Sequence, residues 1–353
     1  MASKETQLLM QNFEQIDRDG QKEILNSYQG KDLKVVEKDF WVCFFLSKLF
    51  QMPDPHPMAF KGGTSLSKGY QLIHRFSEDI DITLDYKTFK NRIELGCDPF
   101  DSGTSRSEIR RASNKIKVEV AKYIEEKLKP YFEEVIQALP SDRSFRVETT
   151  GTEELRIYYD SVLGGSSSDY IEEAVLLEFG GRNLIEPQDE IKIKPFLSEL
   201  QLEGVGFVTA SVQILDPLRT FWEKATLVHD FSNKTDRTEN LPKTERMSRH
   251  WYDLYMMLSA NFDSKALEEE AIDLLRDVVK IKDVFYRASD SNYQNCLNGN
   301  FRMVPSSKFL EKLEKDYKEM GEAKMFEGEP PEFQTVISSI QSFESKLNQY
   351  LRT

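Results

Sequence analysis

The sequence predicts an α+β fold in which a mixed sheet flanked by helices is followed by a helical C-terminal domain. Short β-like runs alternate with helical segments over the first 215 residues, and every segment from Asp216 onward carries helical periodicity. The change in pattern near residue 216 sets the expected boundary. We therefore predict a first domain with N-terminal helices over residues 1–215 and a helical domain over residues 216–353.

The bulk composition is that of a soluble globular protein. The chain has 353 residues, of which 39% are hydrophobic and 30% are charged. No apolar run approaches the ~20 residues of a membrane-spanning helix, and the longest candidate, Phe40–Phe50, contains Lys48 and is predicted as a buried helix. The polar N-terminus has no signal-peptide pattern, and three distant cysteines match neither a disulfide framework nor a metal site. We expect a cytoplasmic protein with no membrane partner.

The first segments are expected in a defined order. Residues 1–57 are predicted to be helical up to three closely spaced prolines, which end the helix. Residues 58–60 are predicted as a short strand, residues 64–75 as a helix and residues 77–84 as a second strand. A loop or lid is expected over residues 85–104.

The segments after residue 104 are predicted from the same sequence patterns. A long charged helix is predicted over residues 105–139, with a break at Pro130. The later elements are expected as strands 144–150, 155–159, 174–179 and 205–215 and as helices 216–230, 246–260, 264–287, 307–325 and 332–350.

Two carboxylates lie close together on one of the predicted strands. Side chains alternate along a strand, so Asp79 and Asp81 should point to one side while Ile80 points into the core. Two adjacent carboxylates repel each other unless a cation lies between them. Mg²⁺ is the natural candidate because it takes oxygen ligands and shares them with substrate phosphates.

A glycine pair precedes these carboxylates within twenty residues. Gly62 and Gly63 would let the backbone approach a phosphate, and a helix starting near Thr64 and Ser65 would direct N–H groups at it. A phosphate site beside metal-binding carboxylates suggests nucleotidyl transfer, in which two metal ions activate the attacking hydroxyl and stabilise the leaving pyrophosphate.

A third carboxylate is expected from a neighbouring strand. Glu178 lies within the apolar run 174–179 and is the best candidate, because an acidic residue is costly to bury there without a partner. The alternative is that Glu178 faces solvent from its strand.

Several motifs resemble those of the AbiEii/AbiGii family, the nucleotidyltransferase-like toxins of type IV toxin–antitoxin and phage abortive-infection systems. The resemblance implies a fold similar to DNA polymerase β. Residues 61–68 followed by 75–81 resemble motif I, and the other matching segments are 36–42, 176–181, 220–225 and 246–254.

The resemblance implies roles for residues at matching positions. Asp79, Asp81 and Glu178 would bind metal, with two Mg²⁺ ions expected, and these three would act in catalysis with Lys224 and Asp253. The residues expected to bind the NTP are Gly62, Gly63, Thr64, Ser65, Lys68, Ser77 and Lys224.

Alternatives remain open for two of these residues. Lys224 is expected either to extend along the surface or to bind the triphosphate. Asp253 is expected either to be a buried partner of Arg249 or Arg246 or to act as a base or orienting group for the attacking hydroxyl.

The leading functional hypothesis is an Mg²⁺-dependent toxin that transfers NMP from an NTP to an acceptor. The resemblance implies the tRNA 3′ end as acceptor, inhibition of bacterial growth or phage propagation, and an antitoxin partner encoded nearby. The alternatives are nucleotidylation of a small molecule or protein side chain, and an NTP-binding regulatory module without turnover.

Basic residues of the predicted helix 105–139, together with Arg143 and Arg146, would then contact RNA phosphates. The alternative is a solvated helix face, and the net charge of −13 argues against general nucleic-acid binding.

Overall fold

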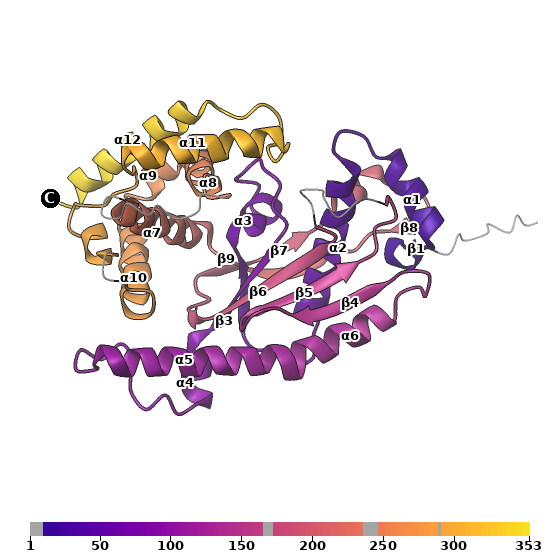
Figure 1. Ribbon diagram of the computed structural model, residues 1–353, viewed down its shortest axis with the longest axis horizontal. Coiled ribbons are helices and arrows are strands. Elements are labelled where there is room, and N and C mark those ends of the chain that lie inside the picture. Colours follow the sequence, from indigo (N-terminus) through magenta and orange to yellow (C-terminus); the bar gives the residue numbers. More distant parts are fainter. Residues whose placement is uncertain (1–9, 165–171, 236–245, 289–290) are drawn as a thin grey trace, which may run out of the picture.

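The computed structural model describes residues 10–164, 172–235, 246–288 and 291–353. Its centre is a seven-stranded mixed sheet with helices around it, which confirms the predicted α+β fold (Figure 1). The strands are β2 (Met58–Lys61), β3 (Ile80–Asp85), β4 (Phe145–Thr149), β5 (Glu154–Tyr159), β6 (Ala174–Asn183), β7 (Gln188–Ile193) and β9 (Ala210–Leu215).

The strand order in the sheet is β4-β5-β6-β3-β2-β9-β7. The pairs β3–β6 and β2–β9 are parallel, and the other pairs are antiparallel. A separate parallel pair joins β1 (Gln11–Asn12) to β8 (Val205–Gly206). The sequence did not predict β7, because its polar residues at the sheet edge carry little apolar alternation.

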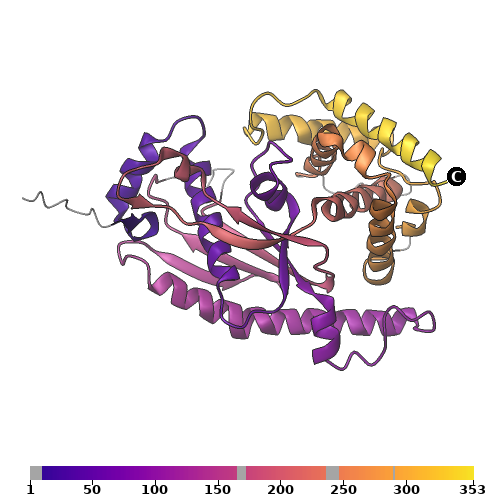
Figure 2. The same ribbon diagram turned by 180° about the vertical axis from the view of Figure 1, so that it is seen from behind.

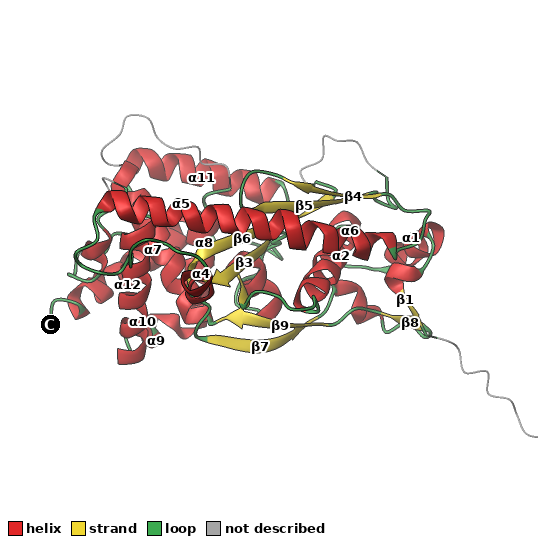
Figure 3. Ribbon diagram, turned by 90° about the horizontal axis from the view of Figure 1, so that it is seen from below, coloured by secondary structure: helices red, strands yellow, loops and turns green. Residues whose placement is uncertain are grey.

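Helices cover the sheet and complete the first hydrophobic core. The helices α5 (Arg106–Tyr123) and α6 (Lys129–Gln137) run along the sheet (Figure 3), and α2 (Leu33–Phe50) packs against β9 and β6. Most of α2 is buried, which confirms the expected buried helix. Within the described residues, no helix is long and apolar enough to cross a membrane.

The long helix predicted over residues 105–139 is present but irregular. It starts with a capping box, in which Ser105 and Glu108 satisfy each other's backbone N–H groups. A π-helical turn, η3 (Ile124–Leu128), separates α5 from α6. Pro130 lies in the first turn of α6 and lacks the N–H that would bond one turn back, which explains a break just before it.

The segments after residue 216 are helical, as predicted. The longer helices are α7 (Pro217–Thr235), α8 (Arg249–Met257), α10 (Glu269–Phe285), α11 (Ser307–Glu322) and α12 (Phe333–Tyr350), seen from behind in Figure 2. They share a second hydrophobic core, which also takes Leu66 and Ile73 from the first half of the chain. The domain boundary at residue 216 stays a prediction.

Two predicted segments differ from the structure. The helical run expected over residues 64–75 consists of α3 (Gly62–Thr64) and a π-helical turn, η2 (Ser65–Gly69), after which Gln71 has a φ of +54°. The chain then extends, and Arg75 pairs with Phe326 in an isolated antiparallel bridge. The expected loop 85–104 contains α4 (Tyr86–Arg92).

The N-terminal region contains short elements besides α2. Residues 1–9 lie outside the described residues, so the predicted helix there is not tested.

The other helical elements of the described residues are short. They are α1 (Arg18–Ser27) and α9 (Asp263–Lys265), the π-helical η5 (Leu258–Phe262), and the 3-10 turns η1 (Phe13–Gln15), η4 (Phe196–Leu200) and η6 (Tyr293–Cys296).

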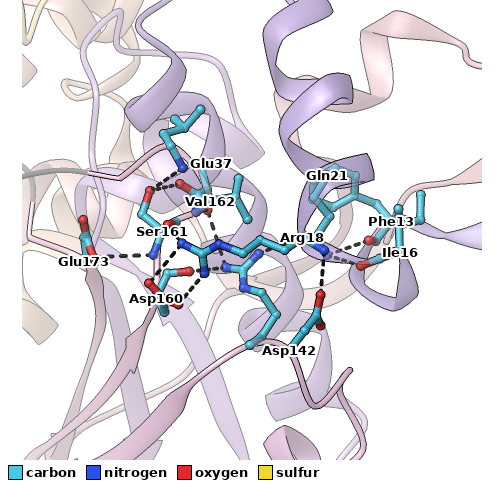
Figure 4. A network of polar contacts seen from close by, with 12 residues as sticks. Phe13, Ile16, Arg18, Gln21, Glu37, Asp142, Asp160, Ser161, Val162 and Glu173 are labelled. Atoms are coloured by element: carbon cyan, nitrogen blue, oxygen red, sulfur yellow. Dashed lines mark hydrogen bonds and ion pairs between the residues drawn. The ribbon is translucent and has the colours of Figure 1, made fainter.

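A polar network fastens α1 to the end of β5, because Arg18 donates from its backbone N–H to the Asp142 side chain and from its guanidinium to the Ser161 carbonyl (Figure 4). Arg143 contacts the same two segments. Its guanidinium donates to the Gln21 side chain and, at 2.7 Å, to the Asp160 carbonyl, and it lies 5.2 Å from the centre of the Trp41 ring. The expectation that Arg143 contacts RNA is therefore wrong, because the side chain is buried and both terminal nitrogens of its guanidinium donate within the fold.

Candidate active site

A row of charged residues crosses the sheet. In the strand register, Lys61 of β2 is paired with Asp81 of β3, and Asp81 is paired with Glu178 of β6. Side chains of directly paired residues project from the same face of a sheet. The third carboxylate therefore stands beside Asp81 on a neighbouring strand, as the sequence predicted, with a lysine on the other side.

Asp79 lies one residue before β3 and lines the same cavity as Asp81. Burial raises the pKa of the Asp79 carboxyl, and the negative charges of Asp81 and Glu78 raise it further. The nearest opposing charge is Arg249, whose Nη1 lies 4.0 Å from an Asp79 oxygen. The charged form of Asp79 is thus disfavoured until another cation approaches.

Glu178 shows the same electrostatic conflict. Burial, followed by the charge of Asp81 and a hydrogen bond with it, raises the pKa of Glu178 to about 7. Solvent still reaches much of this side chain. The carboxylates at this end of the cavity hold protons more tightly than isolated ones, and a divalent cation would relieve their repulsion.

A buried ion network forms the opposite wall. Asp253 on α8 accepts two hydrogen bonds from Arg75, of 2.7 and 2.8 Å, and its Oδ2 lies 2.8 Å from Nζ of Lys224 on α7. The Asp253 side chain has no exposed surface, and those of Arg75 and Lys224 are 3% and 9% exposed. Two cations around one carboxylate leave this network with one surplus positive charge.

The network corrects the expected surroundings of Asp253 and Lys224. Asp253 is paired to Arg75 and Lys224, not to Arg249 or Arg246, which approach Asp79 and Glu78 instead. Burial alone would raise the pKa of Asp253, but Arg75 and Lys224 hold it well below its usual range. Both carboxylate oxygens are engaged, so the geometry favours an orienting role over that of a proton acceptor.

Lys224 does not extend along the surface, which was one of the two expectations for it. Burial lowers the pKa of its ammonium group, the attraction of Asp253 opposes this effect, and the nearby Arg75 and Arg249 charges add to the lowering. A cation in this position would gain from binding an anion in the cavity.

These groups enclose one cavity of about 260 Å³. Five cationic and four acidic side chains contribute to its lining. Its residues are Lys61, Gly62, Gly63, Arg75, Ser77, Asp79, Asp81, Glu178, Thr220, Glu223, Lys224, Leu227, Arg249, His250 and Lys282. Seven of the residues predicted from the sequence therefore meet here, with Asp253 directly behind Lys224.

Three predicted nucleotide-binding side chains do not line this cavity. Lys68 forms a 2.7 Å ion pair with Asp39, and its ammonium lies 3.8 Å from the centre of the Phe196 ring. Thr64 is buried, and Ser65 donates from Oγ to the Gly62 carbonyl at 2.9 Å. Lys68 is thus placed in a different cavity by its pairing with α2, and the Ser65 hydroxyl bonds within the turn itself.

The glycine pair has a steric role within the site, and its expected contact with a phosphate stays a prediction. Gly62 has a φ of +81°, and a Cβ there would lie 1.9 Å from Oδ2 of Asp81. At Gly63, a Cβ would lie 2.5 Å from a guanidinium nitrogen of Arg75 and 2.7 Å from Oγ of Ser77. Both glycines let the charged side chains of the site pack against the turn.

A second cationic group lies at the end of the cavity next to β6. Lys61 lies 3.4 Å from Glu223 of α7, which also accepts a 2.6 Å hydrogen bond from Asn183. Burial would raise the pKa of Glu223, but the cations Lys61, Arg219 and Lys282 lower it to about 2. Glu223 is therefore ionised.

Sequence reasoning missed several lining residues as site residues. Lys61 and Glu223 adjoin predicted site residues and lie within segments 61–68 and 220–225, which resemble family motifs, and these were the signals available for them. Lys282 comes from a helix more than fifty residues beyond Lys224 and carries no motif. His250 also lines the cavity, where burial and then the Lys224 and Arg249 charges hold its pKa well below the usual range, so its ring is neutral.

The chemistry of the donor set fits Mg²⁺. Within the residues that the structure describes, no three His, Cys, Asp or Glu side chains already form a metal-binding group. Mg²⁺ is usually bound by one or two protein carboxylates together with water and substrate phosphates, and it does not require a complete protein cage. Asp79, Asp81 and Glu178 supply such oxygens. Burial and the neighbouring negative charges raise the pKa values of Asp79 and Glu178, and a bound cation would offset both effects.

Comparison with known proteins identifies the family. A family model described as nucleotidyl transferase AbiEii toxin, type IV TA system, matches residues 45–339. This range includes every predicted site residue but not the expected N-terminal motif at residues 36–42. A search of curated proteins gave no match.

Among solved structures, the chain is similar to MenT4, a nucleotidyltransferase toxin from Mycobacterium tuberculosis H37Rv. The two are 14% identical, and the similarity covers 95% of this chain and 98% of that one, with a TM-score of 0.43.

The conformation of the turn gives a first prediction. We expect Gly62→Ala to reduce nucleotidyl transfer by about 100-fold, because the new methyl group would displace the Asp81 carboxylate by roughly 1 Å. Gly180→Ala in β6 is the matched control, since a Cβ there meets no atom within 4 Å. Equal activity of the two variants would show that the Asp81 position does not matter.

The buried network gives a second prediction. We expect Asp253→Asn to lower the free energy of unfolding by about 3–5 kcal/mol, because Arg75 and Lys224 would lose their shared counter-charge. Urea denaturation measures this change. In the control Asp273→Asn, which removes an exposed pair with Arg276, the loss should stay below about 0.5 kcal/mol. Similar losses in both variants would contradict the proposed importance of the buried network.

A third prediction concerns pH. The pKa of Glu178 is about 7 in the folded state, which is above its value in the unfolded chain. The folded state therefore binds this proton more tightly, and its free energy of unfolding falls as the pH rises through 7 and the carboxyl ionises. At pH 8 without metal, Glu178→Gln should therefore be more stable than the natural chain, by about 1 kcal/mol after allowing for solvent screening.

The difference should shrink as the pH falls toward 4, and added Mg²⁺ should stabilise the natural chain more than the variant. Thermal unfolding in EDTA and in Mg²⁺ measures both effects. Identical pH profiles for the two proteins would rule out the inferred repulsion at Glu178.

Proposed function

Because this chain belongs to the AbiEii family of nucleotidyltransferase toxins, we propose that it transfers NMP from an NTP to the 3′ end of tRNA in an Mg²⁺-dependent reaction. Membership makes the chain a nucleotidyltransferase enzyme with an antitoxin as partner. The metal, the nucleotide and the acceptor belong to the proposal.

One observation carries the proposal. A single cavity is lined both by three mutually repelling carboxylates and by Arg75 and Lys224 of a buried network with a surplus positive charge. Phosphoryl-transfer sites need both features, because metal ions must be held by oxygen ligands while the negative charge of the triphosphate is balanced from another side.

The carboxylates have defined parts in this proposal. Asp79, Asp81 and Glu178 would hold Mg²⁺, which supplies Lewis-acid stabilisation of negative charge on the phosphate oxygens when it is bound. The turn at Gly62 and Gly63 keeps the Asp81 carboxylate against the backbone and limits its freedom to move. Ser77 Oγ, at the edge of the same turn, is available to a phosphate oxygen.

The cationic wall would bind the triphosphate. Lys224 faces the cavity and is held there by Asp253, which is itself fixed by two hydrogen bonds from Arg75. This arrangement orients the ammonium before substrate arrives, so little side-chain entropy is lost on binding. Arg249, beside Asp79, adds a further positive charge at the junction of the two walls.

The family description does not decide the acceptor. A small molecule or a protein side chain remains the alternative to tRNA, and the cavity chemistry on the NTP side would be the same for each. The family's enzymatic activity argues against the third alternative, a regulatory module without turnover. Modification of tRNA would take place in the cytoplasm and would explain inhibition of bacterial growth or of phage propagation.

The direct experiment is transfer from each of four α-³²P-labelled NTPs, with Mg²⁺, into total bacterial RNA and into bacterial protein. A labelled band of tRNA size supports the proposal and identifies the nucleotide. Label in protein would replace tRNA with a side-chain acceptor. Absence of label from both pools would direct the search to small molecules.

The metal site gives a fourth prediction. The double variant Asp79→Ala and Asp81→Ala should lose transfer and toxicity while remaining folded, because it removes Mg²⁺ ligands together with their mutual repulsion. Growth of bacteria that express the variant and the labelled-NTP assay measure the outcome. A control with Asp273→Ala and Asp263→Ala on the surface should remain toxic. Full toxicity of the first variant would refute the metal mechanism.

A further inference from the structure

The second cationic group of the cavity is not used by the proposed NTP site. It comprises Lys61 at the end of β2 and Lys282 near the C-terminal end of α10, which both line the cavity, together with Arg182 of β6 and Tyr286, which lie beside Lys282. We propose that this group binds a phosphate and the adjacent base of a single-stranded polynucleotide acceptor. The inference rests on the proposed function and assigns the acceptor side of the same cavity.

Lys282 is the central observation. It lines the cavity, yet no ion pair or hydrogen bond to its ammonium is found among the described residues. Burial lowers the pKa of this group, and the Lys61 charge opposes its ionisation as well, against the attraction of Glu223. A partly buried cation that lacks a bonded counter-ion is stabilised when an anionic ligand arrives.

The charges around Glu223 show why this end of the cavity stays positive. Arg219 already pairs with Asp277 at 2.7 Å and lies 3.6 Å from Glu223. Lys61 is 3.4 Å from the same carboxylate. Glu223 therefore offsets only part of the positive charge, and Lys282 remains in excess.

The unbalanced positive charge of Lys282 favours a phosphodiester over a neutral acceptor. An acceptor strand must bring its own negative charge close to Asp81 and Glu178 and to the triphosphate. Lys61 stands next to Asp81 in the strand register, so it can reduce that repulsion on the side away from Glu178. A protein hydroxyl or a small neutral alcohol would need no such compensation.

Tyr286 adds the second element of a single-strand site. The residue is 38% exposed, and the ammonium of Lys282 lies 5.1 Å from the centre of its ring. The guanidinium of Arg182, which pairs with Glu153 at 3.2 Å, lies 4.9 Å from the same centre. Single-stranded nucleic acids are bound by cations along the backbone and by aromatic rings or guanidinium planes that stack on bases.

The test compares Lys282→Met with Lys280→Met. Lys280 is exposed on the same helix and does not line the cavity, so both variants lose one charge from α10. We expect Lys282→Met to raise the KM for total tRNA about tenfold while the KM for NTP stays within about twofold. The slope of log(kcat/KM) against log salt should become shallower by about 0.7, the value for one phosphate contact on a single strand.

Tyr286 is tested in the same assay. Tyr286→Ala should raise the KM for tRNA, and Tyr286→Phe should retain the natural value, because stacking needs the ring and not the hydroxyl. Thermal unfolding confirms that the variants are folded. The inference is overturned if Lys282→Met behaves like Lys280→Met or if the KM for NTP alone rises.

A binding measurement separates this inference from the proposed function. Fluorescence anisotropy of a labelled single-stranded oligoribonucleotide, without NTP, needs no turnover. If the natural chain labels no RNA, the proposed tRNA reaction fails. In that case, weaker oligonucleotide binding by Lys282→Met than by Lys280→Met would still support the site, and equal binding by the two variants would overturn it.

Discussion

The shared pairing of Asp253 with Arg75 and Lys224 is the interaction on which the cavity depends. It joins three segments, namely the extended stretch before β3, helix α7 and helix α8. Each charge is buried, so none is stable there without the others. The network therefore fixes the helices over the charged row of the sheet and leaves one positive charge directed at the cavity.

The site works through a local separation of charge in an acidic chain. The net charge of −13 conceals a cavity in which cations outnumber carboxylates. Asp79, Asp81 and Glu178 lie together at the start of β3 and on β6. The cations come from β2, from the extended stretch before β3 and from the C-terminal helices. Such an arrangement suits a substrate that brings phosphates and metal ions together. The carboxylates would bind the metal ions, and the cationic side chains would bind the phosphates.

Local patterns in the sequence predicted the part of the site that depends on strand geometry. The alternation of side chains along a strand predicted that Asp79 and Asp81 project from the same side of the sheet. The apolar run around Glu178 predicted the neighbouring strand. The short polar strand β7 was missed, since it carries little alternation. The helix expected over residues 64–75 was too long, because Leu66 and Ile73 are spaced as in a helix although only the first lies in one.

Partners that come from distant parts of the chain could not be predicted. Arg75 and Asp253 are 178 residues apart, and no local pattern reports their contact. Lys68 was assigned to the nucleotide because it follows the glycine turn, but Asp39 on α2 draws it away. Arg143 was predicted to contact RNA from its charge alone. Its hydrogen bond to Gln21 and its contact with the Trp41 ring show that it has a structural role.

The most direct test of the central claim is a crystal structure with Mn²⁺ and a non-hydrolysable NTP. The account predicts an anomalous peak coordinated by carboxylates of Asp79, Asp81 or Glu178, and a triphosphate that contacts Lys224. A metal ion elsewhere, or a triphosphate bound between Lys61 and Lys282 with Lys224 still engaged only by Asp253, would contradict it.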